Sequence, residues 1–265
     1  MKILFPTDLT EESFSAIKTI LPKIISSDKP TEIVLFHVID STGYGSTSVR
    51  DLSQILMDDA TAKLATEKKN IEAAHKIEVT SAVKVGHYDR ELKWHVEKTN
   101  PDLVVLLSKA KHGVLKYVSG QKSVNFIGEL TAPLLIIPID FELDTISKMG
   151  LGIDKNESPT LETLYKIKKL AAYFESDVKM FHVSREVNET TDFYQHISTN
   201  MGFGEIEIVK DENILGGIQH WRDNNNIEVL ITLTQPKGFF QRLRTGSVSR
   251  ELVKENLTSL LIISQ

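Results

Sequence analysis

The chain contains no cysteine among its 265 residues. This absence excludes disulfides, thiolate metal sites and cysteine nucleophiles. The first apolar run, at residues 3–5, is interrupted at once by Pro6 and Asp8. It is too short for a signal peptide and far below the ~18 residues of a membrane-spanning helix. We therefore expect a soluble, cytoplasmic protein with no membrane partner.

An excess of basic residues is also missing. The 31 lysines and arginines stand against 36 aspartates and glutamates, which gives a formal net charge of -5 and a pI near 5.9. This balance argues against a general nucleic-acid-binding protein. Hydrophobic residues make up 41% of the chain, and at roughly 150 residues per domain the length favours two domains, each with its own core.

Familiar catalytic patterns are absent as well. The sequence shows no Walker glycine-lysine loop, no nucleophile elbow and no pair of catalytic carboxylates. Apart from His37 and His182, the histidines show no metal-ligand spacing with aspartate or glutamate. We therefore expect no catalytic residue, no metal site and no enzymatic activity.

The sequence does contain an internal repeat. A glycine turn at Gly120 precedes the apolar run 134–137, and at the same interval Gly246 precedes the apolar run 260–263. A glycine turn that opens a helix exposes backbone amides that can face a phosphate. The repeat therefore predicts a duplicated ligand-binding unit.

The repeat extends over both halves of the chain. Asp8 and Asp154 each close an apolar run, and the next apolar run ends in Phe-His-Val in both halves. The histidines of these two motifs, His37 and His182, thus recur through duplication. Their position favours a hydrogen bond at the end of a strand over a catalytic role.

Apolar strands and amphipathic helices alternate in both halves. This alternation predicts a parallel sheet with helices on both faces and right-handed crossovers. Strands are expected near 3–5, 33–38, 79–85, 103–107 and 134–137, and again near 151–153, 178–183, 206–209, 229–231 and 260–263. Helices are expected near 17–25, 50–75 and 89–99, and again near 161–171, 189–200 and 213–224.

Polar residues interrupt this pattern near 140–147, so we expect domains at 1–142 and 146–265. The two tryptophans, Trp94 and Trp221, fall in expected helices. A half-buried tryptophan in such a helix usually packs it onto the sheet, and we expect this role for both.

Two aspartates lie where such a sheet binds ligands, which is beyond the carboxyl ends of the strands at the point where strand order reverses. Asp8 and Asp154 follow strands there, together with the segments after Leu107 and Leu233. An aspartate in this place either accepts hydrogen bonds from a ribose or a base, or caps the following helix. The sequence alone leaves both alternatives open.

Together these features resemble the universal stress proteins in their tandem form. The resemblance rests on the opening segment 3–8, the two Phe-His-Val strand ends, Val85-Gly86 and the glycine turn before each last helix. It covers nearly the whole chain, and the order and spacing of the pieces are specific when taken together. The resemblance implies an α/β fold of two tandem Rossmann-like (adenine nucleotide alpha hydrolase-like) domains, each a five-stranded parallel sheet with helices on both faces.

Members of this family that bind ATP carry a glycine motif whose amides and hydroxyl hold the phosphates. In the first half of this chain, Leu107 and Ala110 replace two of the glycines, and Gln121 replaces the hydroxyl residue. In the second half, Pro236 replaces a glycine and removes an amide donor, but Ser247 keeps the hydroxyl. The first site is therefore expected to be damaged and the second to be partly retained.

Basic side chains also favour the second half. Lys237 and Arg242 stand near its glycine turn, and guanidinium groups recognise phosphate well. The resemblance implies ATP or AMP as the bound cofactor, held weakly and mainly in the second domain. The binding residues that it implies are Asp154, Val183, Lys237, Gly238, Arg242, Gly246, Ser247 and Val248 in the second half, and Asp8, Val38 and Gly120 in the first.

The resemblance implies a non-enzymatic stress-response or regulatory factor with an adenine nucleotide as its partner. An alternative is an interaction or dimerisation module that has lost nucleotide binding in both domains. In the family, the last strands of two domains pair across a pseudo-twofold axis. The runs 134–137 and 260–263 are therefore expected to form an internal pseudo-dimer or a homodimer. A third alternative, an adenylating enzyme, lacks the histidine and serine-glycine-rich motifs of such enzymes.

Overall fold

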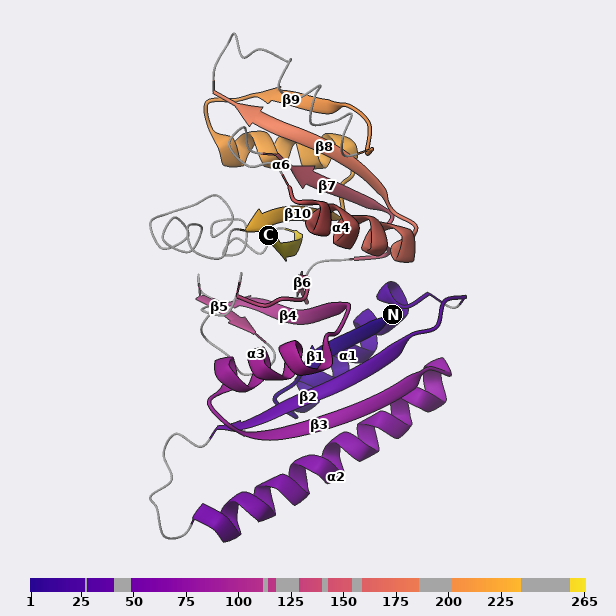
Figure 1. Cartoon of the computed structure of the whole chain (residues 1–265), viewed down its shortest axis with the longest axis vertical. Coiled ribbons are helices and arrows are strands. Elements are labelled where there is room, and N and C mark those ends of the chain that lie inside the picture. Colours follow the sequence, from indigo (N-terminus) through magenta and orange to yellow (C-terminus); the bar gives the residue numbers. More distant parts are fainter. Residues whose placement is uncertain are drawn as a thin grey trace.

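The computed structural model describes residues 1–26, 28–40, 49–111, 114–117, 129–139, 143–153, 159–185, 202–234 and 258–265. At residues 49–52, 110–111, 114–117 and 234 the description covers the backbone only. Strands and helices alternate along these residues, as the sequence predicts (Figure 1). No helix among them is long and apolar enough to cross a membrane.

The first half of the chain, residues 1–139, opens with a strand and ends with a strand. Its elements are β1 (Lys2–Pro6), α1 (Glu11–Ile24), β2 (Glu32–Asp40), α2 (Val49–His75), β3 (Glu78–Gly86), α3 (Tyr88–Thr99), β4 (Leu103–Lys111), β5 (Val114–Tyr117) and β6 (Leu134–Pro138). The second half, residues 143–265, follows the same order. Its elements are β7 (Lys148–Gly152), α4 (Leu161–Phe174), β8 (Asp177–Ser184), β9 (Ile206–Lys210), α6 (Ile214–Asn225), β10 (Val229–Thr234) and β11 (Ser259–Ser264).

All of these strands belong to one sheet, in the order β3-β2-β1-β4-β6-β11-β10-β7-β8-β9, with β5 paired to β4 beside this path. Within each half the five strands along this path run parallel. Counted outwards from the centre of the sheet, the two halves have equivalent strand orders, β6-β4-β1-β2-β3 and β11-β10-β7-β8-β9. The expected fold class, with five parallel strands in each half and helices on both faces, is confirmed.

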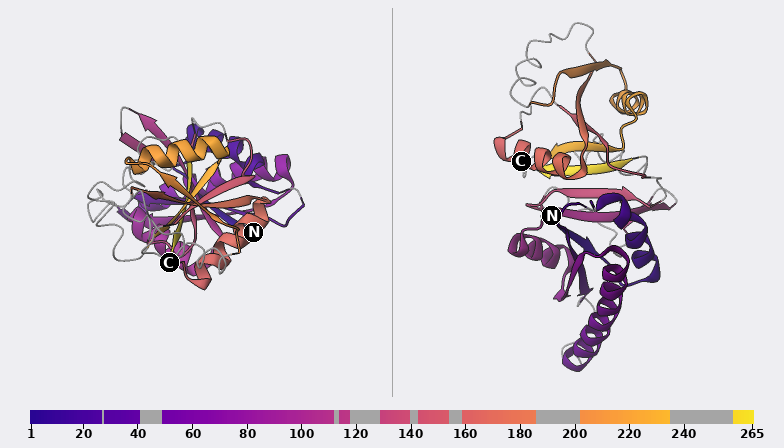
Figure 2. Two further views of the ribbon diagram at one scale, coloured as in Figure 1. Left: turned by 90° about the horizontal axis from the view of Figure 1, so that it is seen from above. Right: turned by 90° about the vertical axis from the view of Figure 1, so that its right-hand side faces the viewer.

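The halves meet at the centre of the sheet, where β6 and β11 pair antiparallel. Leu134 lies opposite Ile262, and Leu135 lies opposite Leu261. The right-hand view of Figure 2 shows the halves stacked with these two strands at their junction. Both strands also pair with a neighbour of their own half, so neither has an open edge. Of the two expected pairings of the last strands, the chain therefore contains the internal one.

Each face of the sheet is covered by helices from both halves of the chain. Ile17 of α1, Leu64 of α2 and Ile167 of α4 belong to one buried apolar cluster. Leu92 of α3 and Ile218 of α6 belong to the other. Successive strand residues point to opposite faces, so both clusters take residues from the same strands. Each core is therefore shared by the two halves.

Polar contacts between the two halves reinforce this junction. Lys29 donates to the backbone carbonyls of Ala172 and Tyr173 at the end of α4, with Nζ to oxygen distances of 2.7 and 3.0 Å. The hydroxyl groups of Tyr173 and Thr31 lie 2.6 Å apart. A lysine at the C-terminus of a helix satisfies carbonyls that have no partner within the helix. The first half thus caps a helix of the second.

Two details differ from the sequence-based expectations. First, β4 continues past Leu107 to Lys111 and returns as the antiparallel strand β5, which the sequence analysis missed. Second, Trp94 is 43% exposed, so the expectation that it packs α3 onto the sheet is wrong. Trp221 is only 4% exposed and has the expected role in α6. The expected helix near 189–200 lies outside the described residues.

Candidate functional site

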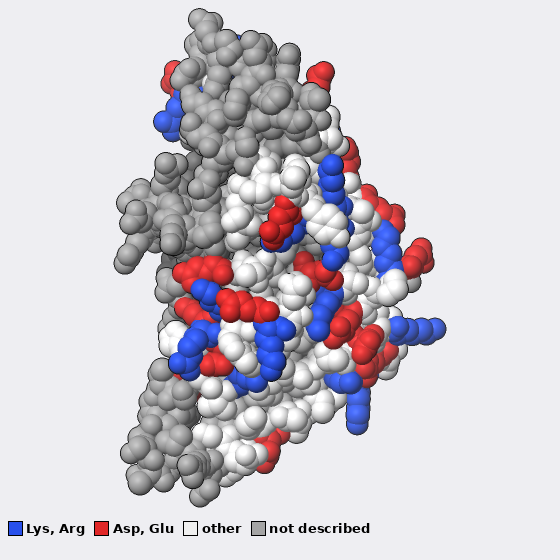
Figure 3. Space-filling view, in the orientation of Figure 1, with Lys and Arg blue, Asp and Glu red and all other residues white. Residues whose placement is uncertain are grey.

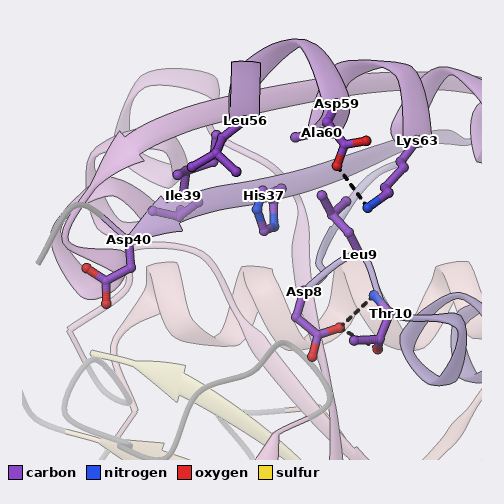
Figure 4. Close-up of a pocket in the computed structure, with 11 residues that line it drawn as sticks. Asp8, Leu9, Thr10, His37, Ile39, Asp40, Leu56, Asp59, Ala60 and Lys63 are labelled. Carbon is purple, nitrogen blue, oxygen red and sulfur yellow. Dashed lines mark hydrogen bonds and ion pairs between the residues drawn. The ribbon is translucent and has the colours of Figure 1, made fainter. Parts of the chain in front are cut away.

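A cavity of about 500 Å³ opens beyond the carboxyl ends of β1 and β2 (Figure 4). It lies beside β1, the strand at which the strand order of the first half reverses, where open parallel sheets bind ligands. We call it the first-half cavity. Its lining residues are Asp8, Leu9, Thr10, His37, Val38, Ile39, Asp40, Leu56, Asp59, Ala60 and Lys63. Two of the expected binding residues, Asp8 and Val38, are therefore brought together.

His37 joins the two strand ends at the floor of this cavity. Its Nδ1 donates to the carbonyl oxygen of Thr7 over 2.8 Å, and the amide of Thr7 donates to the carbonyl of Phe36 over 2.9 Å. In the second half, His182 Nδ1 donates to Ile153 over 2.7 Å in the same arrangement. The expectation of strand-end hydrogen bonds for both histidines is confirmed.

The environment keeps His37 neutral near pH 7. Burial lowers its pKa below the ordinary value of 6.5, and Lys63 acts in the same direction. The hydrogen bond to Thr7 and the charge of Asp8 raise the pKa but do not outweigh the burial. Since Nδ1 carries the proton that Thr7 accepts, Nε2 of the neutral ring is a hydrogen-bond acceptor.

Asp8 orders the turn between β1 and α1. One of its carboxylate oxygens, Oδ1, accepts from the amide and the hydroxyl of Thr10, over 3.0 and 2.6 Å. Thr10 is in turn the N-cap of α1, because its hydroxyl accepts from the amide of Ser13. Asp8 therefore supports the capping residue rather than capping the helix itself. Its Oδ2 has no hydrogen-bond partner within the described part of the chain.

The charge around the cavity is mainly negative. Three carboxylates line it, those of Asp8, Asp40 and Asp59. The one basic lining residue, Lys63, forms an ion pair with Asp59 across one turn of α2, with a distance of 2.9 Å between Nζ and Oδ2. Like charges in a partly enclosed space repel. The cavity therefore suits a neutral or hydrogen-bond-donating group better than a phosphate.

Sequence reasoning missed the part of the wall that comes from α2. Leu56, Ala60 and Lys63 lie on one face of this helix at spacings of four and three residues, and they close the cavity opposite the strand ends. This spacing is visible in the sequence. It shows only that one face of the helix is turned inward, because the strands that the face meets are set by the crossover from β2 to β3.

The residues that follow Leu107 do not form a loop that opens toward the first-half cavity, because they continue β4 as far as Lys111. Lys109, within β4, reaches the first turn of α1, where its Nζ lies 2.6 Å from Oε1 of Glu12. Glu12 is not among the residues of the cavity wall. The segment after Leu107, which was expected to line the crevice, is thus a strand that is held against α1.

Several expected binding residues have no described position. Val183 does have one: it is the last residue but one of β8, and it packs against α6, since a Cβ on Gly217 would lie 2.8 Å from its Cγ1. The remaining residues of the expected second-half site and Gly120 lie outside the described residues: Asp154, Lys237, Gly238, Arg242, Gly246, Ser247 and Val248. Among the described residues, no group of three or more histidines, aspartates and glutamates is placed to hold a metal ion.

Comparison with solved structures finds the same fold over the whole chain. A universal stress protein from Archaeoglobus fulgidus matches with a TM-score of 0.71 and 18% identity, over 100% of this chain and 96% of that one. A functionally unknown protein from Pseudomonas aeruginosa matches with a TM-score of 0.59 and 12% identity, over 99% of this chain and 92% of that one. At such low identity these likenesses show the fold alone.

Sequence comparison identifies the family. No curated protein matches the chain. The model of the universal stress protein family matches residues 1–138, the part that contains β1 to β6 and the whole wall of the first-half cavity. This match spans more than half of the 265 residues, and the chain therefore belongs to the universal stress protein family.

Proposed function

We propose that this chain is a non-enzymatic stress-response regulator that binds an adenine nucleotide, and that the first-half cavity receives the nucleoside part. The observation that carries the proposal is the cavity itself, which brings Asp8 and Val38 together beyond the ends of β1 and β2. Its volume of about 500 Å³ lies within the roughly 300–1,000 Å³ of small-molecule sites.

The charges of the cavity support one orientation of the nucleotide. Because Asp8, Asp40 and Asp59 line it, the base and ribose enter and the phosphates extend away from the carboxylates. Oδ2 of Asp8 accepts a ribose hydroxyl or a base amino group. The second half, where the resemblance implies the main nucleotide site, remains a separate proposed site in which Lys237, Arg242 and Ser247 hold the phosphates of a nucleotide of its own.

Calorimetric titration with AMP and ATP tests this proposal. We expect dissociation constants of about 1 mM or below, equivalent to at least ~4 kcal/mol. Asp8→Ala weakens binding about tenfold, because one hydrogen bond to a charged acceptor is lost. Asp144→Ala, which removes an exposed aspartate outside the cavity wall, leaves the affinity unchanged.

Two other outcomes are informative. A loss of binding in Ser247→Ala with none in Asp8→Ala assigns the nucleotide to the second half. The absence of heat with either nucleotide at about 1 mM overturns the nucleotide part and leaves the interaction module. That alternative has one supporting observation, since the paired strands β6 and β11 already build a pseudo-dimer within the chain.

A further inference from the structure

One nitrogen of the His37 imidazole forms a hydrogen bond within the protein, and the other does not. Nδ1 is held by the carbonyl of Thr7. Nε2 has no hydrogen-bond partner among the described residues. It is also not one of the fully buried polar atoms that lack a partner among these residues, so it is accessible. The ring lines the cavity, and Figure 4 shows it between the loop that carries Asp8 and the helix that carries Lys63. Its free edge is therefore available to a bound molecule.

The other polar groups of the wall are also mainly acceptors. Asp8, Asp40 and Asp59 contribute carboxylate oxygens, which accept hydrogen bonds only. Lys63 is the donor among the charged lining side chains, and it is already paired with Asp59. A group that enters between these residues is stabilised if it donates hydrogen bonds, and it is destabilised if it brings only lone pairs or negative charge.

We infer that His37 selects the ligand of the first-half cavity, with Nε2 as the acceptor for an amino group on a neutral heterocycle. The inference rests on the proposed nucleoside site and adds to it the chemical feature that is recognised. A purine that carries an exocyclic amino group therefore binds better than the same purine without it. Nδ1 keeps its separate task of joining the ends of β1 and β2.

Adenosine and purine riboside are the probes that isolate this feature, because they differ only by the amino group. We expect wild-type protein to bind adenosine about tenfold more tightly than purine riboside, the effect of one hydrogen bond of ~1.4 kcal/mol. Titration calorimetry of both nucleosides gives the ratio directly. A ratio near one, with both nucleosides bound, overturns the inference but leaves the proposed nucleoside site standing.

Two reciprocal variants separate the tasks of the two nitrogens. His37→Asn keeps a donor near the position of Nδ1 and removes the acceptor at Nε2, so the adenosine preference disappears while the stability changes little. His37→Gln keeps an acceptor near Nε2 and loses the bond to Thr7. It retains the preference but melts at a lower temperature.

His182→Asn is the matched control, because His182 makes the same strand-end bond in the other half. It should change thermal stability as much as His37→Asn does and leave the nucleoside ratio unaltered. An undiminished adenosine preference in His37→Asn contradicts the inference. Failure of wild-type protein to bind either nucleoside overturns both the inference and the proposed nucleoside site.

Discussion

In the first half Phe36 stacks on His95, whereas in the second half Phe181 stacks on Trp221. The ring centroids lie 4.4 and 4.0 Å apart, with interplanar angles of 20° and 21°. Both phenylalanines belong to the Phe-His-Val strand ends. Their partners lie on equivalent helices, α3 before β4 and α6 before β10. Duplication has kept the stacking geometry and exchanged one ring.

The exchange changes how the polar edge of the ring is satisfied. Nε1 of Trp221 donates to the carboxylate of Glu207 on β9. Nε2 of His95 is buried and has no hydrogen-bond partner among the described residues. An unsatisfied buried polar atom costs free energy, so the same position strengthens the second half and weakens the first.

Truncation of each ring gives the largest expected effect. Trp221→Ala should lower the free energy of unfolding by about 3–5 kcal/mol, because it leaves a cavity and removes the partner of Glu207. His95→Ala should cost less than half of that, because the lost packing is partly offset by removal of the unsatisfied nitrogen. Urea denaturation at neutral pH measures both values. Equal losses would break the comparison between the two stacks.

The pH dependence of stability is the next largest effect. Burial lowers the pKa of His95 to about 4, and Lys84, Lys2 and Lys98 act in the same direction. The unfolded chain, in which the pKa is near 6.5, therefore binds the proton more readily than the folded chain. The contribution of neutral His95 to the free energy of unfolding is therefore fully present above pH 6.5, and it is lost as the pH falls to about 4.

We expect this loss to be about 2 kcal/mol. His95→Phe keeps the stack without a titrating group, and its stability should fall less over the same pH range. Thermal unfolding of the wild-type and His95→Phe proteins across that pH range measures the difference between their stabilities. The effects of the other titrating groups are the same in both proteins and cancel in this difference. Parallel profiles would contradict the assignment to His95.

A smaller effect is expected where α4 meets the first half. Tyr173→Phe removes the hydroxyl that lies 2.6 Å from that of Thr31 and accepts from the amide of Ser26. The expected loss is about 1 kcal/mol, the usual size for a partly buried hydrogen bond. Tyr165→Phe on the exposed face of the same helix should leave the melting temperature unchanged. If the two variants behave alike, the junction contact adds nothing to stability.

Much of the fold can be predicted from the sequence, because it depends on patterns that repeat. The alternation of apolar strands and amphipathic helices predicts the parallel sheet. The resemblance to the universal stress proteins, rather than the pattern itself, predicts the central pairing of the apolar runs at 134–137 and 260–263. The bonds of His37 and His182 follow from their recurrence at the ends of two strands.

The predictions that are wrong or missing concern side chains whose neighbours are distant in the sequence. On α3 the inward positions are Leu92, His95 and Val96, so Trp94 faces outward. There Lys84 and Lys98 cover its ring at 4.8 and 4.7 Å. Composition cannot decide between adjacent residues of a helix, because one step along the helix turns a side chain by about 100°.

The same limit applies to the candidate site. Asp8 could be expected there because it closes an apolar run that forms a strand, and Val38 because the resemblance to the family implies it. The α2 wall and the open nitrogen of His37 depend on how distant segments meet. On the face shown in Figure 3, acidic and basic side chains alternate over the described surface. The net charge of -5 gives no hint of the local excess of carboxylates in the cavity.

One pair of matching contacts shows what covalent fusion allows. Asp102 and Glu228 hold equivalent places, since each accepts from the backbone amide at the start of the neighbouring strand, that of Lys2 or Lys148. Asp102 then pairs with Lys169 of the other half, whereas Glu228 accepts from Ser147 of its own.

In a dimer of identical chains, every residue must serve on both sides of the twofold axis. Joining the copies in one chain removes that requirement and makes their pairing independent of protein concentration. Each copy is then free to specialise, so one half can lose a binding function without forcing the same loss on the other.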